Sequence, residues 1–196
     1  MQANLEDDFA NGRDIWMWFQ AYRRLPQFNI LEALDLFNRI AVRDNPIDAY
    51  YYLYILYFIR WRQGILDDYR RVQDNISQCQ SMLGRIARIR SYEWWGKEPV
   101  WCPLIHQSQL GNWDHNRNFY SNSDPLDRLE GAVKQIKGAQ SGLISLGPFV
   151  AFFVPGTEFL PGRDENASVD FYLGFSYDGL RAWSVHRLEN QTGNVL

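Results

Sequence analysis

Cys102, His106 and His115 are the residues whose side chains could together hold a metal ion. Cysteine sulfur and histidine nitrogen are common zinc ligands, and zinc sites usually carry them as closely spaced pairs such as CxxC or HxxxH. The sequence contains no such pair. We therefore expect these three residues to have ordinary structural roles, and we predict neither a metal nor another cofactor.

Other patterns resemble catalytic motifs only superficially. Residues 174–179 (Gly-Phe-Ser-Tyr-Asp-Gly) have the wrong spacing for a nucleophile loop, and they lie between two strand-like runs instead of before a helix. The chain has no GxxxxGK[ST] phosphate-binding motif. Side chains that are adjacent in sequence point apart in helices and strands, which separates the acidic pairs. These pairs are Asp7 with Asp8, Asp67 with Asp68, and Asp164 with Glu165. The sequence predicts no catalytic residue, and therefore a protein that is not an enzyme.

A cluster of arginines marks the end of the first half of the chain, beside a tryptophan-rich stretch. It consists of Arg70, Arg71, Arg85, Arg88 and Arg90. Guanidinium groups next to exposed aromatic rings can hold phosphates and stack on bases. Alternatively, these arginines form ion pairs with acidic neighbours and cover apolar surface with their aliphatic stems. The acidic neighbours are Asp67, Asp74 and Glu93.

The elements that must position these residues fall into two regions. Residues 128–186 contain five strand-like segments, each pair separated by turn residues, which is the pattern expected of a small β-barrel or sandwich. The segments are 128–136, 141–146, 149–154, 168–177 and 180–186. Asp178–Gly179 favours a type I′ hairpin turn, which needs positive φ at both central positions. A barrel of this size is usually a binding device.

The first 90 residues are helical in pattern. Apolar spacing, proline and glycine breaks and the N-cap candidate Asn29 predict four helices. These span 14–24, 30–43, 47–63 and 67–83. The third is apolar on nearly every side, so it must be covered on every side. The two helix pairs repeat after about 35 residues, a period typical of tetratricopeptide-like pairs.

Residues 91–125 join the two regions and are unusually rich in aromatic residues. A flexible linker would not carry so many, so we expect this connector to pack the barrel onto the last helix, and the two parts to move as one body. The fold class is therefore α+β, with N-terminal antiparallel tetratricopeptide-like helical pairs (1–90), the connector (91–125) and a five-stranded barrel (126–196), which the resemblances given below imply is OB-fold-like.

The net charge of −3 argues against a protein whose whole surface binds polyanions. Two cysteines, Cys79 and Cys102, fit an intracellular chain with free, buried thiols, against the alternative of one disulfide. The N-terminus is acidic and has no signal-peptide pattern, and the apolar run 49–59 is too short to cross a bilayer. We expect a cytoplasmic protein with no membrane partner.

Parts of the barrel region resemble cold-shock and related OB-fold domains, in which aromatic residues of the second and third strands stack on bases. The resemblance is carried by 131–134, 141–144, 152–155 and 168–171. It implies that Phe153 is a stacking residue. Other stacking positions of the family are occupied here by Gln135, Ser141, Leu143 and Pro155. Most of the family's aromatic platform is therefore missing.

The whole chain resembles the C-terminal module of the large sterile-alpha-motif antiviral factors, which are related to other P-loop NTPase defence proteins. The residues that carry the resemblance are 91–97, 104–113, 128–131 and 170–179. The resemblance implies tetratricopeptide-like helices followed by an OB fold, in an innate-defence protein that represses translation. The family's RNA-cutting and nucleotide-binding parts would then lie upstream of this module.

Together, these observations predict a non-catalytic recognition and regulatory module that contacts RNA or another single-stranded nucleic acid. The candidate contact residues are Arg85, Arg88, Arg90, Lys134, Lys137, Phe153, Arg181 and Trp183. The alternative is a docking module that binds a partner protein or other domains of its own parent protein. The mildly acidic barrel and the missing stacking residues favour this alternative.

Overall fold

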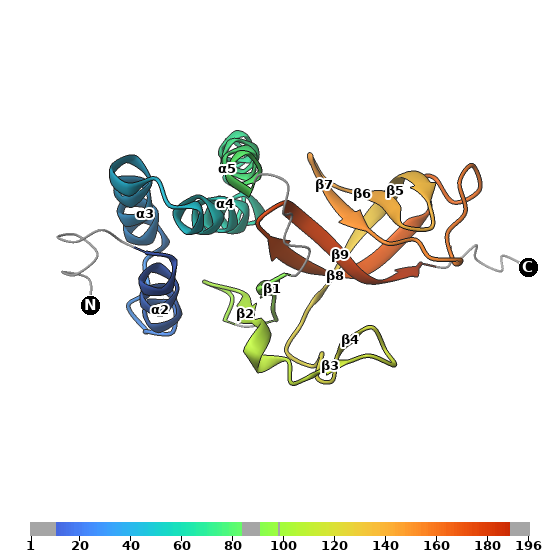
Figure 1. Cartoon of the computed structure of the whole chain (residues 1–196), viewed down its shortest axis with the longest axis horizontal. Coiled ribbons are helices and arrows are strands. Elements are labelled where there is room, and N and C mark those ends of the chain that lie inside the picture. Colours follow the sequence, from blue (N-terminus) through green and yellow to red (C-terminus); the bar gives the residue numbers. More distant parts are fainter. Residues whose placement is uncertain (1–10, 84–90, 98, 189–196) are drawn as a thin grey trace, which may run out of the picture. The chain divides into compact units, whose positions relative to one another are not determined.

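The computed structural model describes residues 11–83, 91–97 and 99–188, which form two compact units. Of these residues, 11–83, 99–103 and 176–179 belong to the helical unit. The barrel unit comprises 91–97, 104–175 and 180–188. The predicted fold class is confirmed: helices come first and a closed, OB-like β-barrel follows (Figure 1). Arg85, Arg88 and Arg90 lie outside the described residues.

Four helices form the first unit, and their ends differ from the predicted ends by at most two residues. They are α2 (Gly12–Tyr22), α3 (Ile30–Asp44), α4 (Ile47–Arg62) and α5 (Asp68–Leu83). Asn29 caps α3 as predicted, because its side chain accepts a hydrogen bond from the backbone N–H of Leu31. Asn45 ends that helix in the left-handed conformation, at φ 52°.

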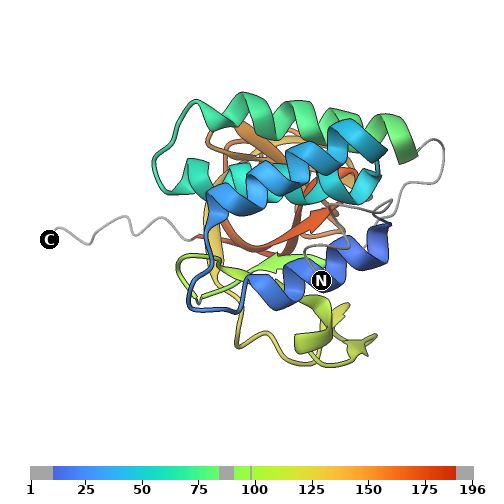
Figure 2. The same cartoon turned by 90° about the vertical axis from the view of Figure 1, so that its left-hand side faces the viewer.

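Helix α4 is the core of the helical unit. It packs against α2, α3 and α5, and Figure 2 shows α3 and α5 running alongside it. Ten of its residues are buried, which explains why the sequence is apolar on every side. Tyr52 packs its ring against Phe19 and Phe37, with centroids 4.5 and 5.6 Å away. The prediction that this helix is covered on every side is thus confirmed.

The turn of the last hairpin, Ser176–Gly179, also belongs to the helical unit. Tyr54 donates its hydroxyl proton to the Ser176 carbonyl at 2.7 Å, and Tyr177 donates to the carboxylate of Asp48. Only Gly179 of this turn has positive φ, at 117°. Its central residues are therefore Tyr177 and Asp178, and the predicted type I′ turn centred on Asp178–Gly179 is wrong. The prediction of hairpin-turn chemistry for this segment is confirmed.

The barrel consists of five strands. They are β5 (Arg128–Gly138), β6 (Ser141–Leu146), β7 (Phe149–Phe153), β8 (Ser168–Ser176) and β9 (Gly179–Arg187). Their neighbour order is β5-β6-β7-β9-β8, and β8 pairs again with β5 to close the cylinder. Strands β7 and β9 are parallel, whereas the β5–β6, β6–β7 and β5–β8 pairs are antiparallel. This closure by a parallel third and fifth strand is the OB-like topology.

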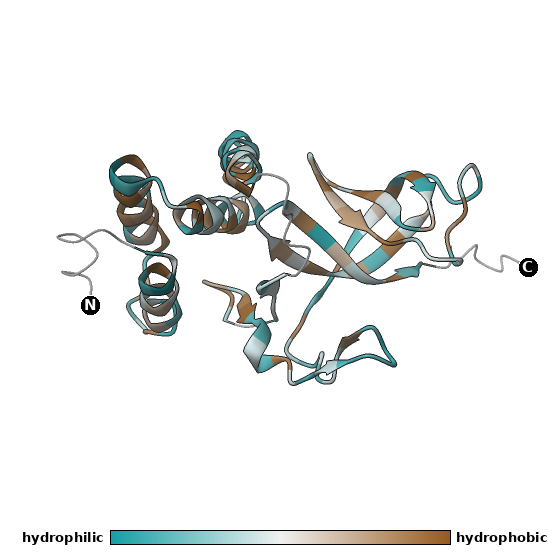
Figure 3. Cartoon of the chain, in the orientation of Figure 1, coloured by the Kyte–Doolittle hydropathy of each residue, from teal (hydrophilic) through white to brown (hydrophobic). Residues whose placement is uncertain are grey.

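Every second side chain of a strand points into the barrel and fills its interior. Figure 3 shows this pattern as alternating hydrophobic and hydrophilic residues along the strands. On β6, Gly142, Ile144 and Leu146 point inward, and the residues between them are half-buried. The ring of Phe153 lies where a Cβ on Gly142 would be, so this glycine makes room for the core.

Most of the connector belongs to the barrel unit. Strands β1 (Glu93–Trp95) and β2 (Leu104–His106) extend the sheet beyond β8. A 3-10 turn (Gln107–Gln109) leads to a hairpin of β3 (Trp113–Asp114) and β4 (Phe119–Tyr120). The expected packing of the connector onto the last helix, and the expected rigid attachment of the two parts, stay predictions. Within the described part of the chain, no helix is long and apolar enough to cross a membrane.

Candidate nucleic-acid interface

One row of side chains crosses the outer face of the barrel, with one residue from each of four neighbouring strands. Gln135 on β5 pairs with Leu143 on β6, which pairs with Phe152 on β7. Phe152 in turn pairs with Arg181 on β9, across the parallel contact of β7 and β9. These four residues define the outer row. Because alternate strand residues share a face, the outer row lies opposite the side chains that fill the core.

Phe152 and Arg181 form the centre of the outer row. The Arg181 guanidinium lies over the Phe152 ring, with its carbon 4.7 Å from the ring centroid. Phe152 is half-buried, whereas Arg181 is only 9% exposed. A cation over an aromatic face is a stabilising electrostatic contact that also shields the ring. Such a pair places an aromatic surface for stacking beside a positive charge.

Two lysines lie on β5 near one end of the outer row. Lys134 and Lys137 are both exposed, and neither forms an ion pair with another described residue. The pairing of β5 with β6 shifts register between Val133 and Gln135, so Lys134 and Gln135 are both exposed although they are consecutive. The bulge thus adds a positive charge beside Gln135.

Phe153 is not a stacking residue. It is 1% exposed and packs inside the barrel, where its ring meets that of Phe159 edge-on at 5.5 Å. A buried ring cannot present its face to a base. Phe152, the next residue along, occupies the outward position that sequence reasoning missed. A difference of one residue moves a strand side chain to the other face of the sheet.

Trp183 lies in an aromatic cluster away from the outer row. This cluster covers the outside of β8 and β9 with connector residues, and consists of Trp94, Trp113, Phe119, Tyr120, Tyr172 and Trp183. The Trp183 ring centroid is 5.8 Å from that of Trp94, and its indole N–H donates to the Ser91 hydroxyl at 3.3 Å. The half-buried indole is therefore committed to packing, although Trp183 follows Arg181 by two residues on the same face of β9.

Arg128 holds the edge of this aromatic cluster. Its Nε and Nη2 donate to the two carboxylate oxygens of Asp170, both at 2.8 Å, and its guanidinium lies 4.5 Å from the Tyr172 ring centroid. The hydrogen bond from Arg128 lowers the pKa of Asp170 below its ordinary value. Because both ends of this guanidinium are engaged, Arg128 is a structural residue and not a phosphate contact.

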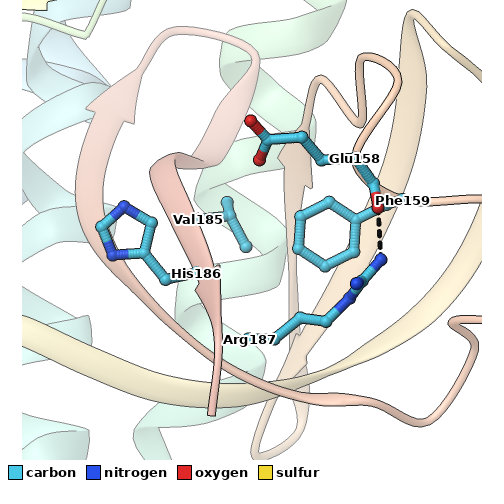
Figure 4. A pocket seen from close by; sticks show the side chains of 5 residues that line it. All are labelled: Glu158, Phe159, Val185, His186 and Arg187. Carbon is cyan, nitrogen blue, oxygen red and sulfur yellow. Dashed lines mark hydrogen bonds between the residues drawn. The ribbon is translucent and has the colours of Figure 1, made fainter. Parts of the chain in front are cut away.

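A pocket of about 390 Å³ lies at one end of β9, lined by Glu158, Phe159, Val185, His186 and Arg187 (Figure 4). Arg187 donates to the Glu158 carbonyl and to the Asp164 carboxylate, the latter at 2.9 Å. Hydrogen bonds from Arg163 and from the Leu160 backbone lower the pKa of Asp164, and the charge of Arg187 acts in the same direction. The imidazole and the Glu158 carboxylate point to different sides in Figure 4. This pocket therefore brings no two reactive groups together.

The sequence candidates for a metal site are not gathered in one place. Cys102 is buried in the helical unit. His106 accepts a hydrogen bond from the Ser108 backbone, and His115 is exposed beside the β3–β4 hairpin. No group of three potential metal ligands occurs among residues 11–83, 91–97 and 99–188. The predicted burial of the cysteines is confirmed, and burial raises the pKa of the Cys79 thiol to about 12.

Comparison with known proteins identifies no relative. No family model matches the chain, and neither a curated protein nor a solved structure is similar to it. The candidate interface therefore depends on the topology of the barrel and on the residues of the outer row.

Proposed function

We propose that the barrel binds single-stranded RNA across the outer row. The observation that carries this proposal is the half-buried Phe152 with Arg181 over its ring, in the middle of an OB-like face with two unpaired lysines beside it. An aromatic ring stacks on any base, and the two lysines near one end of the outer row can contact phosphates there.

The proposed contact uses one base. In this proposal the base stacks on the half-buried Phe152 ring, beside the Arg181 guanidinium that lies over it. Stacking of one base contributes about 1–3 kcal/mol, so a single aromatic residue supports weak binding with little sequence preference. Because phosphate contacts release counterions, the affinity should fall steeply as the salt concentration rises.

The resemblance to the antiviral factors suggests the biological process in which the proposed RNA binding takes part. In our proposal the chain is a non-catalytic, cytoplasmic recognition module of a larger innate-defence protein that represses translation. The module would hold or sense RNA while activities located elsewhere in the parent protein act on it. Arg85, Arg88 and Arg90 remain candidate contacts in this proposal.

Titration of a fluorescently labelled 12-nucleotide oligo(U) at two salt concentrations tests the proposal. Phe152→Ala should weaken binding about tenfold, within the range for one lost stacking contact. Val150→Ala is the matched control, since Val150 also faces outward on β7 and is 37% exposed. The proposal would be rejected if the affinity for oligo(U) did not depend on the salt concentration, or if the two variants bound oligo(U) equally well.

A second candidate function is protein docking, favoured by a different observation. Trp113 is 37% exposed at the surface of the aromatic cluster. Tryptophans that pack against a rigid base commonly act as anchors of protein interfaces. Trp113→Ala should then abolish partner capture and leave oligo(U) binding unchanged, whereas Phe152→Ala should do the reverse.

A further inference from the structure

Three hydrogen-bonding side chains from consecutive helices meet at one point on the helical unit. Tyr57 on α4 accepts a hydrogen bond from the Asn38 amide of α3 at 3.3 Å. It accepts a second from the Arg71 guanidinium of α5 at 3.2 Å. Asn38 and Arg71 are both exposed, so the meeting point is at the surface. Figure 2 shows the three helices running alongside one another.

Donors outnumber acceptors at this point. The Tyr57 hydroxyl accepts twice, and no described residue accepts its own proton. Arg71 has no carboxylate within ion-pair distance in the part of the chain that the structure describes. Its guanidinium instead lies 5.1 Å from the centroid of the Tyr57 ring, which fixes its orientation. The Asn38 amide is already used, because it donates to the Leu34 carbonyl at 2.8 Å and to the Tyr57 hydroxyl, and it thereby holds that hydroxyl in place. The fixed guanidinium fork next to the phenolic O–H matches the two oxygens of an anion.

Two other arginines of the helical unit do form ion pairs with carboxylates. Arg60 lies 3.1 Å from the Asp68 carboxylate, and Arg39 lies 3.2 Å from that of Asp35. Arg70 is adjacent to Arg71 and equally charged, and it hydrogen-bonds to the Tyr69 hydroxyl instead. The pairing of Arg70 and Arg71 with Asp67 and Asp74, which the sequence left open, is not observed among the described residues.

We propose that Asn38, Tyr57 and Arg71 form a binding site for a carboxylate group of a peptide. The surroundings favour a single carboxylate over a polyanion, because exposed acids on α3 and α5 and in the turn before α5 offset the positive charge. These acids are Asp35, Asp67 and Asp74. Repulsion from these acids grows with the charge of the ligand, so a run of RNA phosphates would be repelled more strongly than one carboxylate on an otherwise neutral peptide. The site is independent of the outer row and of RNA binding by the barrel.

The experiment follows the Arg71 Nε–Hε resonance of the ¹⁵N-labelled full chain by NMR, assigned by its loss in Arg71→Ala. The probes are sodium acetate, with sodium chloride at equal ionic strength as the control, and neutral hexapeptides. One hexapeptide has a free C-terminal carboxylate, one is amidated, and one is amidated but carries an internal glutamate. We expect acetate and one or both carboxylate-bearing peptides to shift the resonance, and the fully neutral peptide not to. The two peptides distinguish a C-terminal from a side-chain carboxylate.

Arg70→Ala is the matched control, since it removes the same charge one residue away. Because Arg71→Ala lacks this resonance, the affinities of the variants are compared by isothermal titration calorimetry with the carboxylate-bearing peptides. Arg71→Ala should weaken peptide binding at least about fivefold, as expected for loss of a charge-assisted bidentate contact, and Arg70→Ala should change it less than about twofold. Tyr57→Phe keeps the ring and removes only the hydroxyl, so it should give an intermediate loss. Equal losses for the two arginine variants, no acetate-specific shift, or a stronger response to oligo(U) than to either peptide would each overturn the proposal.

Discussion

The two outer faces of the barrel use aromatic residues in opposite ways. On the β8–β9 face, Tyr172 and Trp183 are covered by connector aromatics and sit in a packed cluster. On the face formed by β6 and β7, Phe152 has no such cover, and one guanidinium lies over its ring. The chain has eight tryptophans, and the structure places Trp94 and Trp183 in packing and Trp113 at the rim of the same cluster.

The number of aromatic residues therefore does not locate a nucleic-acid face. A ring can bind a base only if one side of it is open or is closed by a group that can move. An arginine side chain can leave a ring, whereas a sheet extension such as β1 and β2 cannot do so without unfolding. Substitutions on the covered face should accordingly change stability, and substitutions on the other face should change binding.

Trp94→Ala should have the largest effect, and it should act on stability. Trp94 is 1% exposed and packs edge-to-face on Phe119 with centroids 5.2 Å apart. Truncating a buried tryptophan costs about 3–5 kcal/mol, because the surroundings relax only partly around the cavity. Urea unfolding followed by circular dichroism measures this loss. A variant of near-native stability would show that the cluster does not hold the connector in place.

The adjacent pair Phe153 and Phe152 gives the sharpest contrast between core and surface. Phe153→Ala removes a ring from the core and should cost about 3–5 kcal/mol of unfolding free energy. Phe152→Ala removes a half-exposed ring and should cost about 1 kcal/mol. The same urea experiment on both variants tests this, and oligo(U) titration should show the loss of binding for Phe152→Ala in a fully folded protein. Equal destabilisation would contradict the assignment of the two faces.

The faces of β7 could have been read from the sequence. Serines at 141 and 145 mark the outward face of the 141–146 segment, so Ile144 and Leu146 point inward. The turn at Gly147–Pro148 pairs Leu146 with Phe149, which places Phe149, and with it Phe153, in the core. The resemblance to cold-shock domains favoured Phe153 as the base-stacking residue, whereas the local alternation of side chains would have favoured Phe152.

Other features depend on contacts that are distant in sequence. The bounds of the helices and barrel strands follow from local periodicity and turn residues, which is why they were predicted closely. The parallel pairing of Phe152 with Arg181 brings together strands that are not neighbours in the chain, and no local pattern specifies it. Strands β1 to β4 have two or three residues each, too few to show alternation. They form because they bury the rings of Trp94 and Phe119, and this burial depends on contacts between residues that are distant in the sequence.

The Arg128–Asp170 ion pair should make the stability of the covered face depend on pH. Arg128→Met should cost about 1–2 kcal/mol at pH 7, less than for a fully buried pair, because both side chains are partly exposed. The hydrogen bond from Arg128 lowers the folded-state pKa of Asp170 below its ordinary value of 3.8. A depressed carboxyl pKa stabilises the fold above the unfolded-state value, and this contribution disappears as the pH falls through the lower, folded value.

Acid unfolding between pH 5 and about pH 2 measures this contribution. Wild-type protein should lose stability as Asp170 becomes protonated, and Asp170→Asn should show a shallower dependence on pH over the same range. Some dependence must persist in the variant, since Asp164 also has a lowered pKa. Identical pH profiles for the two proteins would mean that the Arg128–Asp170 pair does not hold the covered face.

Lys134→Ala and Lys137→Ala should have the smallest effect on stability and a specific effect on binding. Both side chains are exposed and make no ion pair with a described residue, so the unfolding free energy should change by less than about 0.5 kcal/mol. Each lysine that neutralises a phosphate contributes about one unit to the slope of log affinity against log salt concentration, so each substitution should lower that slope by about one. Lys97→Ala is the control, because Lys97 is exposed and precedes the barrel strands in the connector. If Lys97→Ala changed the slope as much as either barrel lysine, binding would depend on overall charge, and the difference between the two faces would have no role in recognising RNA.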